Sequence, residues 1–451
     1  MNIPAGIFKA YDIRGLYPSE IHEEAAFKIG RAFVSYLDAR RIAVSRDMRV
    51  SSPALAEAFI DGARTQGADV VDFGLMGTDM LYFAVARDGF DGGAQITASH
   101  NPGGYNGVKM VRREAAPLSG DAGIGEIRDM VTRDAIPAPT RPRGGRGAQD
   151  ILAAYIERVF SFIDPAAIKP FNVVLDAGSG MGGLVAPKLF DRLPCRTTRL
   201  CFDIDGTFPN HEANPLIEEN RRDIVERVIQ EKADIGIAWD GDADRCFFID
   251  GSGEFIAGDF ITALLAQAFL MRSPGEKIVY DVRASYAVKD TVAAFGGTAL
   301  MNRVGHAFIK RRMRDENAIF GGEVTGHYYF RDYYFADNGF IPALLILELM
   351  SKTGQTLREL LAPLGRKYFI SGEINTTVAS MDLIPARLEA LAAKYHDGHT
   401  YTLDGFSVEY PDWHFNVRAS NTEPLLRLNL EALTPELMAQ RRDEVLALIR
   451  R

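Results

Sequence analysis

This chain of 451 residues has few cysteines, only short apolar runs and no excess of positive charge. Cys195, Cys201 and Cys246 are odd in number and form no C-x-x-C pair, which excludes a disulfide framework and any recognisable zinc motif. The longest apolar stretches, 260–271 and 340–350, are too short to span a bilayer and contain polar breaks, so we expect buried helices there.

The net charge of −9 argues against nonspecific binding to nucleic acid. An anionic substrate would need a local cluster of Arg, Lys and His against this background. The first residues, MNIPAGIFKAYDIRG, contain neither a basic segment nor an apolar core of the kind found in signal peptides. We therefore expect a cytoplasmic protein with no membrane partner.

Length and composition favour a globular protein of several domains. Hydrophobic residues make up 47% of the chain and charged residues 25%, close to the average for soluble proteins. At roughly 100–200 residues per domain, the chain should divide into about three or four domains.

The pattern along most of the chain alternates between strand and helix. Apolar, β-branched runs such as RIAVSRD, NVVLDAGSG and KIVYDVR are followed by glycine-containing turns and helical patterns. This alternation is typical of α/β domains with mostly parallel sheets, whose functional sites lie at the carboxyl ends of the strands.

Changes in composition mark the expected domain boundaries. The Pro-, Gly- and Arg-rich segment 135–147 predicts a linker, and further boundaries are expected near residues 250–253 and 364–371. The last eighty or so residues read as strands and turns closed by the helix TPELMAQRRDEVLALIR, which indicates an α+β unit.

Ser99 lies in the segment Thr97-Ala98-Ser99-His100-Asn101-Pro102, directly after the expected strand GGAQI. A serine where a strand passes into a loop can be surrounded by backbone N–H groups and a cation, and can then carry a phosphoryl group. The same residues would also suit a simple Asn-Pro turn with a capping serine.

Asp240, Asp242 and Asp244 alternate on a glycine-containing loop after the strand ADIGIAW. Three converging carboxylates suit a small hard cation such as Mg²⁺, although solvated surface acids would have the same pattern. Arg245 follows them and could complement a phosphoryl group held by the metal.

A glycine-rich loop at 178–183 offers a different class of function. It matches G-x-G-x-x-G after a strand, with Asp203 about twenty residues later, and so favours a dinucleotide-dependent oxidoreductase. Glycines at a strand-to-helix turn also serve close packing alone.

Two further loops carry polar residues suited to a phosphorylated sugar. The loop at 321–327 offers Glu323, Thr325 and His327 for hydroxyl groups, unless these are ordinary surface or capping residues. The loop at 418–422 has a cation followed by short polar side chains, which suits a phosphate-binding nest but also a turn that stabilises itself. Its candidate residues are Arg418, Ser420, Asn421, Thr422 and, further on, Arg427.

Taken together and in this order, FKAYDIRG, TASHNP, DGDADR, GGEVTGH and RASNTEP resemble the α-D-phosphohexomutase family over essentially the whole chain. ITASHNPGGYNGVKMVRREAAPLSGD and GIAWDGDADRCFFID are most similar to its bacterial phosphomannomutase and phosphomannomutase/phosphoglucomutase branches. The resemblance implies four domains around a central cleft, namely three α/β domains of shared topology with mixed sheets and a smaller C-terminal α+β domain. We place them at residues 1–148, 149–252, 253–366 and 367–451.

By this resemblance Ser99 is a phosphoserine and binds Mg²⁺ with the three aspartates. Glu323 and Thr325 read the sugar, and the 418–422 loop holds the distal phosphate. The same cleft would be lined by the following cationic or titratable residues: Arg14, His100, Lys109, Arg245, Arg283, His306 and His327. Thr325 stands where serine is commoner in the family, and Arg283 where other branches have lysine, which leaves fine specificity open.

The resemblance predicts a phosphomannomutase that interconverts mannose 6-phosphate and mannose 1-phosphate through a hexose 1,6-bisphosphate intermediate and activator. We expect activity on glucose phosphates too. Lys109 and His306 are candidates for moving the hydroxyl proton. The alternatives are phosphoglucomutase as the main activity, an NAD-dependent oxidoreductase, and a non-catalytic phosphosugar-binding protein. The oligomeric state is open between monomer and dimer.

Overall fold

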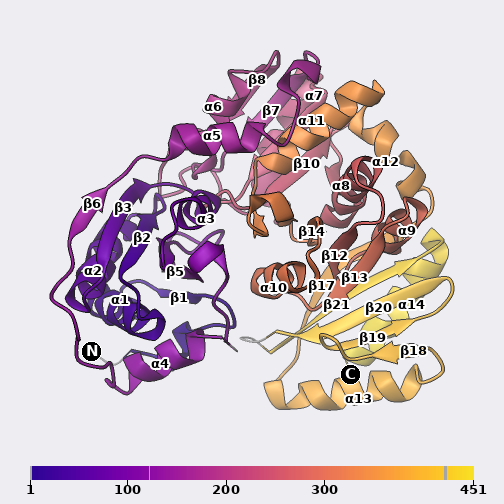
Figure 1. Ribbon diagram of the computed structural model, residues 1–451. Helices are drawn as coiled ribbons and strands as arrows, with labels where there is room; N and C mark the ends of the chain where they lie inside the picture. Colours follow the sequence, from indigo (N-terminus) through magenta and orange to yellow (C-terminus); the bar gives the residue numbers. More distant parts are fainter. Residues whose placement is uncertain (1–2, 121, 421–423, 451) are drawn as a thin grey trace. The chain divides into compact units, whose positions relative to one another are not determined.

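The expected alternation of strands and helices is present in the computed structural model, which describes residues 3–120, 122–420 and 424–450 (Figure 1). The chain separates into two compact units. The first comprises Met1–Ile256 and Thr325–Leu357, and the second comprises Ala257–Val324 and Arg358–Arg451. Each unit is described separately below.

The first unit begins with a mixed sheet in the order β1-β5-β4-β2-β3-β6. Strands β4, β2, β3 and β6 run parallel, whereas β5 is antiparallel to both β4 and β1. The elements of this part are η1 Ala5–Ile7, β1 Ile13–Leu16, α1 Glu23–Leu37, β2 Arg41–Arg46, α2 Ser52–Thr65, β3 Asp69–Leu75, α3 Thr78–Arg87, β4 Gly92–Ile96, β5 Tyr105–Arg112, η2 Arg113–Ala115, α4 Ile124–Thr132 and β6 Arg146–Ala148.

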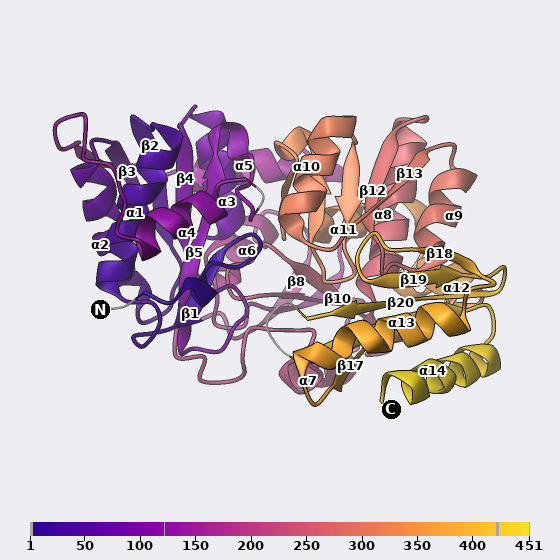
Figure 2. The same ribbon diagram turned by 90° about the horizontal axis from the view of Figure 1, so that it is seen from below.

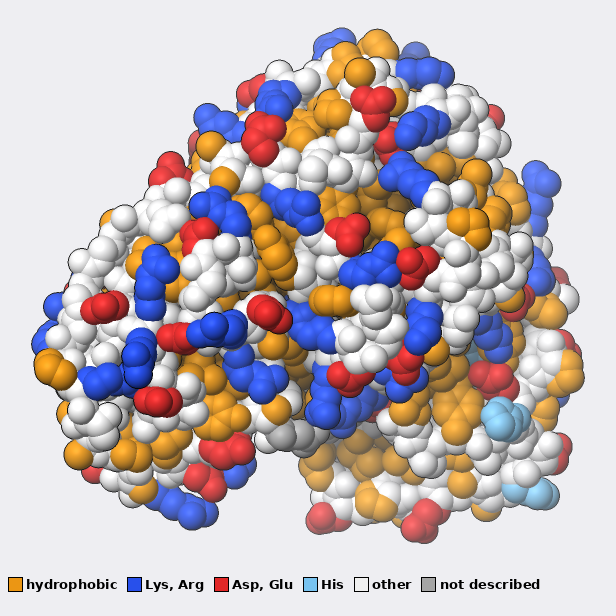
Figure 3. All heavy atoms as spheres, in the orientation of Figure 1, with side chains coloured by type: hydrophobic (Ala, Val, Ile, Leu, Met, Phe, Trp, Pro, Cys, Tyr) orange, Lys and Arg blue, Asp and Glu red, His pale blue; other side chains and the backbone are white. Residues whose placement is uncertain are grey.

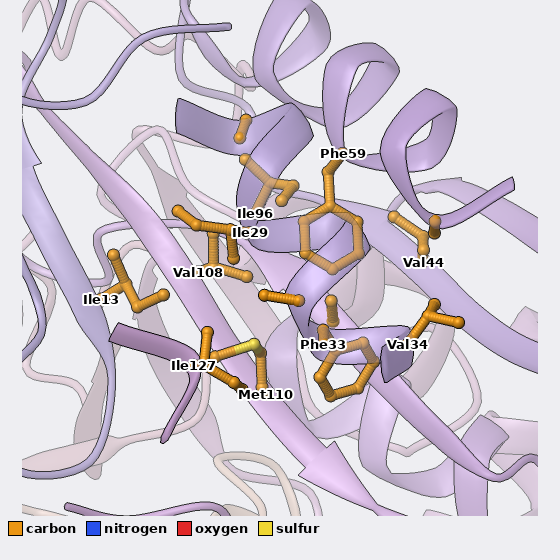
Figure 4. Close-up of a cluster of buried hydrophobic side chains, with 14 of the residues drawn as sticks. Ile13, Ile29, Phe33, Val34, Val44, Phe59, Ile96, Val108, Met110 and Ile127 are labelled. Carbon is orange, nitrogen blue, oxygen red and sulfur yellow. The ribbon is translucent and has the colours of Figure 1, made fainter. Parts of the chain in front are cut away.

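Alternation of side chains along the central strands builds the core of this sheet. Ile42, Val44 and Ile96 join one buried cluster with apolar residues of α1, α2 and α4, and Figure 4 shows part of it. The opposite face carries α3, where Gly93 leaves room for Val85 and Leu81. Successive residues of a strand point to opposite faces of the sheet, so both faces carry apolar side chains. Helices cover both of these faces.

The segment 135–147, expected to be a linker, ends instead in a strand. Its last residues form the start of β6, which pairs in parallel with β3. Arg143 forms an ion pair with Asp61, and Arg146 pairs with Glu57 and Asp72. These arginines attach the segment to the sheet edge, which composition alone does not indicate.

The second sheet of the first unit has the order β11-β10-β9-β7-β8. Strands β9, β7 and β8 are parallel, and β10 runs antiparallel to β9 and β11. The elements are α5 Leu152–Phe160, η3 Pro165–Ala167, β7 Asn172–Asp176, α6 Gly182–Phe190, β8 Arg196–Leu200, η4 Glu219–Arg221, α7 Arg222–Glu231, β9 Ile235–Trp239, β10 Cys246–Asp250 and β11 Phe255–Ile256. The unit also contains η5 Arg331–Tyr333, α11 Ile341–Thr353 and the antiparallel pair β15 Tyr328–Phe330 and β16 Ala336–Asp337, which is not part of this sheet.

The second unit contains three parallel strands, which belong to the mixed sheet β13-β12-β14-β15-β16, and a separate antiparallel sheet. Strands β13, β12 and β14 are parallel, and the C-terminal sheet has the antiparallel order β17-β21-β20-β19-β18. The elements are α8 Gly258–Arg272, β12 Lys277–Asp281, α9 Tyr286–Ala294, β13 Thr298–Asn302, α10 His306–Glu316, β14 Phe320–Gly322, α12 Leu357–Gly365, β17 Phe369–Thr377, η6 Met381–Leu383, α13 Ile384–Lys394, β18 His399–Tyr401, β19 Phe406–Glu409, β20 Trp413–Ala419, β21 Leu425–Ala432 and α14 Pro435–Ile449.

The C-terminal sheet has a core of its own. Leu391 of α13 and Val445 of α14 are buried against apolar side chains of its strands, and Figure 2 shows both helices beside the sheet. Helix α13 was not expected from the sequence, which was read as strands and turns before the last helix. The α+β character of this region is confirmed.

Three sets of parallel strands share one order. They are β3-β2-β4, β8-β7-β9 and β13-β12-β14. In each set the strand that comes first in the chain lies in the middle, with the second on one side and the third on the other. The antiparallel strands make the sheets mixed, rather than mostly parallel as the alternation alone suggested. The four-domain α/β fold is confirmed, while the exact domain limits and the central cleft stay predictions.

Both long apolar stretches are helical. They lie in α8 and α11, and most residues of these helices are buried. Glu348, the acidic break in the second stretch, is buried, accepts the Asp164 N–H at 3.0 Å and pairs with Lys352. No helix within the described ranges is long and apolar enough to cross a membrane. On the face drawn in Figure 3, charged side chains of both signs are interspersed.

Candidate active site

Ser99 follows β4 in a backbone conformation that is unusual for a serine. Its φ is +52°, in the left-handed region, and its side chain is buried. This conformation costs a non-glycine residue on the order of 1–2 kcal/mol. The hydroxyl of Thr97 accepts the Ser99 N–H at 2.8 Å, which helps to fix the turn.

A single buried guanidinium, that of Arg49, holds the whole serine loop. Its Nη2 donates to the carbonyl oxygens of Ser99 at 2.8 Å and Asn101 at 2.5 Å. Its Nη1 donates to those of Pro102 at 2.8 Å and Tyr105 at 3.0 Å. Four carbonyl groups of one loop therefore converge on one side chain, which offsets the strain at Ser99.

The aspartate loop joins β9 to β10 and lies against the serine loop. A Cβ on Gly241 would come 2.6 Å from the Ser99 carbonyl oxygen, so only glycine allows this approach. The Ser99 hydroxyl donates to Asp240 Oδ2 at 2.9 Å. Thr78, at the start of α3, donates to Asp242 Oδ2 through its hydroxyl. The two loops thus form one site at the carboxyl ends of β4 and β9.

The three aspartates are buried and can present oxygens to a cation. Oxygens of Asp240, Asp242 and Asp244 all lie within 4.8 Å of one another. Among the described residues, Asp242 Oδ1 and Asp244 Oδ1 are buried and accept no hydrogen bond. Unpaired buried carboxylate oxygens are costly, and hard divalent cations prefer such oxygen ligands. The residues present therefore fit Mg²⁺.

The charges of this cluster shift its pKa values strongly. Burial, reinforced by Asp244 and Asp242, raises the pKa of Asp240 well above its ordinary value. Burial also raises the pKa of Asp242, but the Lys109 ammonium outweighs it and the net pKa is lowered. Burial lowers the pKa of Lys109, yet the three carboxylates raise it above its usual range.

Lys109 lies on β5 and bridges two of the carboxylates. Its Nζ is 2.7 Å from Asp242 Oδ2 and 2.6 Å from Asp244 Oδ2. These are the oxygens opposite the two that accept no hydrogen bond. Lys109 therefore holds its proton and leaves the other oxygen of each carboxylate without a hydrogen bond from the described residues.

His100 and Arg245 extend the positive side of the site. His100 Nδ1 lies 3.3 Å from Ser99 Oγ and 2.6 Å from Arg245 Nη2. Burial, together with the charges of Arg245 and Arg14, holds the pKa of His100 well below its ordinary value. A neutral imidazole accepts the guanidinium N–H at Nδ1. Arg14 donates to Asn101 Oδ1 at 2.6 Å, so it borders the same loop.

His327 also belongs to the first unit and reaches the aspartates from β15. Its Nδ1 lies 2.8 Å from Asp337 Oδ2 and 3.8 Å from Asp244 Oδ1. All three side chains are buried. The expected contact of His327 with sugar hydroxyls stays a prediction, and the ion pairs described for it here are with Asp337 and Asp244.

Arg283 and Glu323 form the centre of a second group, in the second unit. Arg283 makes two hydrogen bonds to Asp281, each of 3.0 Å, and its Nη2 lies 3.8 Å from Glu323 Oε1. The Gly305 N–H donates to Glu323 Oε1 at 3.0 Å, next to His306, the first residue of α10. Glu323 is thereby oriented at the end of β14.

Glu373 on β17 gathers three guanidinium groups. Its carboxylate lies 3.3 Å from Arg283, 3.5 Å from Arg418 and 3.3 Å from Arg427. Burial raises the pKa of Glu373, but the three positive charges outweigh it and lower the pKa. The arginines expected to bind phosphate are thus preassembled around one carboxylate.

The remaining predicted residues divide as follows. Thr325 belongs to the first unit and Glu323 to the second, so the two residues predicted to read the sugar lie on either side of a unit boundary in the sequence. Ser420 is buried at the end of β20. Asn421 and Thr422 lie outside the described residues.

Four residues of these groups escaped the sequence analysis: Arg49, Thr78, Asp337 and Glu373. Arg49, Thr78 and Glu373 contact their partners from a distant part of the chain, whereas Asp337 pairs with His327 ten residues earlier. The signal available for Arg49 was its place two residues after Asp47, at the carboxyl end of a strand. Nothing in the sequence around Glu373 indicates that three arginines surround it.

The glycine loop 178–183 serves packing. A Cβ on Gly180 would come 2.5 Å from the Gly241 carbonyl oxygen, and one on Gly183 would come 2.5 Å from that of Phe202. The N–H groups of Ser179 and Met181 already donate to protein carbonyls, at 2.8 and 2.9 Å. These donors are the ones a pyrophosphate would need, so the loop gives no support to dinucleotide binding.

Family models for phosphoglucomutase/phosphomannomutase match nearly the whole chain. The alpha/beta/alpha domains I, II and III match residues 5–135, 153–253 and 257–368, and the C-terminal domain matches residues 373–448. Each match includes one of the loops described above.

Relatives and solved structures agree with these matches. The chain is 43% identical to the phosphohexose mutases of Xanthomonas campestris pv. campestris strain B100, over 100% of both chains. It is 43% identical to a phosphomannomutase of Salmonella montevideo, over 98% of each. A crystal structure of a phosphoglucomutase/phosphomannomutase family protein from Burkholderia thailandensis superposes with a TM-score of 0.88 at 34% identity, covering 99% of this chain and 97% of that one.

Proposed function

Because the chain belongs to the phosphoglucomutase/phosphomannomutase family, we propose that it is a phosphomannomutase that interconverts mannose 6-phosphate and mannose 1-phosphate. It is a phosphohexomutase, and hexose phosphates are its substrate class. The proposal includes glucose phosphates as further substrates.

One observation supports the mechanism most strongly. The Ser99 hydroxyl, at 2.9 Å from Asp240, shares a buried site with two carboxylate oxygens that accept no hydrogen bond from the described residues. A serine beside unpaired acceptors is suited to carry a phosphoryl group next to a cation. Magnesium dependence is a property of this family. Asp240, Asp242, Asp244 and a phosphoryl oxygen on Ser99 would hold the ion.

A Mg²⁺ ion held by these residues would neutralise negative charge on the group being transferred. Phosphorylated Ser99 donates its phosphoryl group to the free hydroxyl of a hexose monophosphate. The Oγ–P bond breaks, the sugar O–P bond forms, and a hexose 1,6-bisphosphate results. After the bisphosphate reorients, its other phosphate is returned to Ser99 and the isomeric monophosphate leaves. In each half-reaction the proton of the attacking hydroxyl passes, by way of a side chain of the site, to the oxygen whose bond to phosphorus breaks.

The chain's own residues position and neutralise the reacting groups. Arg49 fixes the serine loop, while Lys109 and Arg245 supply positive charge beside the carboxylates. Its three carboxylate neighbours raise the pKa of Lys109 and hold it protonated, so it supplies positive charge and does not accept a proton in this state. The roles of Lys109 and His306 in proton transfer stay predictions.

The second unit supplies the groups for substrate binding. Glu323 would accept hydrogen bonds from sugar hydroxyls. Arg283, Arg418 and Arg427 would exchange part of their pairing with Glu373 for the distal phosphate, which offers a stronger charge and more acceptors. The cytoplasmic location and the choice between monomer and dimer stay predictions.

A turnover assay tests the proposal. Mannose 1-phosphate, a trace of hexose 1,6-bisphosphate and Mg²⁺ should yield mannose 6-phosphate, and a chelator should abolish the reaction. Asp242→Asn should lower kcat on the order of 10²-fold with a much smaller change in KM, since it weakens charge neutralisation in the transition state. Asp203→Asn, at an exposed position, serves as the control.

Two results would contradict these assignments. A wild-type enzyme with no turnover of any hexose phosphate would refute the function. An unchanged Mg²⁺ requirement and normal kcat in Asp242→Asn would refute the three-aspartate site.

A further inference from the structure

A second cluster of metal-binding side chains lies in the first unit, outside the site described above. It consists of Asp176 at the end of β7, Cys201 directly after β8, and His211 in the loop that follows. We propose that these three residues form a binding site for a zinc-like divalent cation, with Asp, Cys and His ligands and an open fourth position.

The separations between the ligand atoms suit tetrahedral coordination. His211 Nε2 lies 3.1 Å from Asp176 Oδ2 and 3.6 Å from Cys201 Sγ. With ordinary bond lengths to zinc, a tetrahedral centre requires about 3.3 Å between nitrogen and oxygen and about 3.6 Å between nitrogen and sulfur. All three atoms lie within 4.8 Å of one another.

The hydrogen bonds around the cluster orient its members as metal ligands are usually oriented. His211 Nδ1 lies 3.0 Å from the carbonyl oxygen of Glu212, which leaves Nε2 for the metal. The Gly178 N–H donates to Asp176 Oδ1 at 2.9 Å, which leaves Oδ2 directed at the histidine. Metal-bound histidines typically make such a bond through the other ring nitrogen.

Hydrogen bonding alone explains the cluster less well than a cation does. Both Asp176 Oδ2 and Cys201 Sγ approach the same nitrogen of His211, and that nitrogen has at most one N–H to donate. A cation placed between the three atoms satisfies all of them at once.

The ligand set selects the class of metal. Thiolate and imidazole favour zinc and similar borderline metals over Mg²⁺, which prefers oxygen ligands such as those of the aspartate loop. Cys201 and His211 are only partly buried, so an ion can enter. The three ligands come from separate segments with a single cysteine among them, which explains why no zinc motif is recognisable in the sequence.

The position of the cluster links it to the serine loop. The segment between Cys201 and His211 contains Gly206, where a Cβ would come 2.3 Å from the Met48 carbonyl oxygen. It also contains Phe208, whose ring centre lies 5.3 Å from Arg49 Cζ. An ion would tie both ends of this segment to β7 and so stabilise the support behind Arg49.

Cobalt titration of the full-length enzyme in saturating Mg²⁺ tests the proposal, because Co²⁺ bound by a thiolate has a charge-transfer absorption that Co²⁺ bound by carboxylates lacks. One equivalent of Co²⁺ should produce this absorption, and Zn²⁺ should displace it and raise the midpoint of thermal unfolding. Cys201→Ser should abolish both effects. The matched control is Cys195→Ser, at a partly buried cysteine of the same sheet, and it should retain both.

A second variant tests the site in case Cys201→Ser fails to fold. Asp176→Asn retains the oxygen that accepts the Gly178 N–H but removes the anionic ligand, so Co²⁺ affinity should fall about tenfold or more while the absorption remains. Wild-type enzyme without the absorption, or an absorption that survives Cys201→Ser, would overturn the proposal.

Discussion

At the scale of single residues, the contacts around Ser99 fix the position of its loop. Ser99 has a left-handed backbone, and Arg49 binds four carbonyl groups of its loop. A serine that must receive and release a phosphoryl group gains from a fixed location, because small displacements of reacting groups are costly for the rate.

Replacement of Arg49 by lysine should therefore impair the chemical step. An ammonium has three donors on a flexible stem and cannot reproduce a planar fork that serves four carbonyl groups. We expect kcat for mannose 1-phosphate to fall about 10²-fold, with KM changed far less. Steady-state kinetics measure both quantities.

Arg113→Lys provides the control, since Arg113 is exposed and forms an ion pair with Asp91 away from the serine loop. Its kcat should stay within twofold, or about 0.4 kcal/mol, of the wild type. An Arg49→Lys enzyme with normal kcat, or one in which KM alone changes, would contradict the positioning role.

The sequence predicted the residues that lie in compact motifs and missed those that act from a distance. Ser99 and the three aspartates each lie in a short loop after a strand, so local pattern was enough. Arg49 and Glu373 owe their importance to carbonyls and guanidiniums supplied by segments far along the chain. Such contacts depend on tertiary packing, which no local pattern encodes.

At the scale of elements, the two loops of the first site occupy equivalent places. The serine loop joins β4 to the antiparallel β5, and the aspartate loop joins β9 to the antiparallel β10. In both sheets the loop follows the third strand of the parallel set, and the loop of Glu323 follows β14, the third strand of another. One topology, used repeatedly, supplies the chemistry and the binding groups.

Gly180 is predicted to support this arrangement rather than to bind a nucleotide. A methyl group at this position would press on Gly241, which itself contacts the Ser99 carbonyl. Gly180→Ala should lower kcat about 10²-fold by displacing the aspartate loop and should cost about 1–3 kcal/mol of stability. Kinetics and thermal unfolding check the two effects.

Gly147→Ala is the matched control, because no atom lies within 4 Å of the Cβ it would gain. The variant should behave as wild type in both measurements. If Gly180→Ala were fully active, or if NAD bound to the wild type and not to this variant, the packing role would be refuted.

Element prediction succeeded where periodicity was strong. The alternating runs became β2, β7, β9 and β12, and the apolar stretches became α8 and α11. It failed at β6, whose RGA sequence has no strand character and which forms because its arginines find acidic partners beside β3. The antiparallel strands were likewise invisible, because strand direction depends on connections and not on composition.

At the scale of the whole molecule, the functional residues divide between two compact units. Ser99, which is proposed to carry the phosphoryl group, and the three aspartates belong to the first, and the arginine group around Glu373 belongs to the second. The proposed reaction assigns phosphoryl transfer to residues of the first unit and binding of the distal phosphate to residues of the second. The proposed cycle therefore depends on the complete chain.

Sugar selectivity should follow from the sugar-reading residues Glu323 and Thr325. By family resemblance they contact the 3- and 4-hydroxyls, which mannose and glucose present alike. Strong discrimination arises when the wrong substrate leaves a buried polar group unpaired. We expect turnover of mannose 1-phosphate and measurable turnover of glucose 1-phosphate, much less of galactose 1-phosphate, and little of N-acetylglucosamine 1-phosphate.

Comparison of kcat/KM for the four sugar phosphates checks this expectation. A clear preference for the galactose or the N-acetylglucosamine compound would mean that the loop reads other positions of the sugar.

The central claim is that Ser99 carries the phosphoryl group, and intact-mass measurement tests it most directly. After incubation with a hexose 1,6-bisphosphate and Mg²⁺, the wild type should contain a fraction heavier by one phosphoryl group, and mannose 6-phosphate should return it to the unmodified mass. Ser99→Ala should never gain this mass, whereas Ser119→Ala, at another buried serine of the same unit, should gain it normally. A phosphorylated Ser99→Ala protein, or a wild type that turns over substrate without ever becoming phosphorylated, would contradict the account.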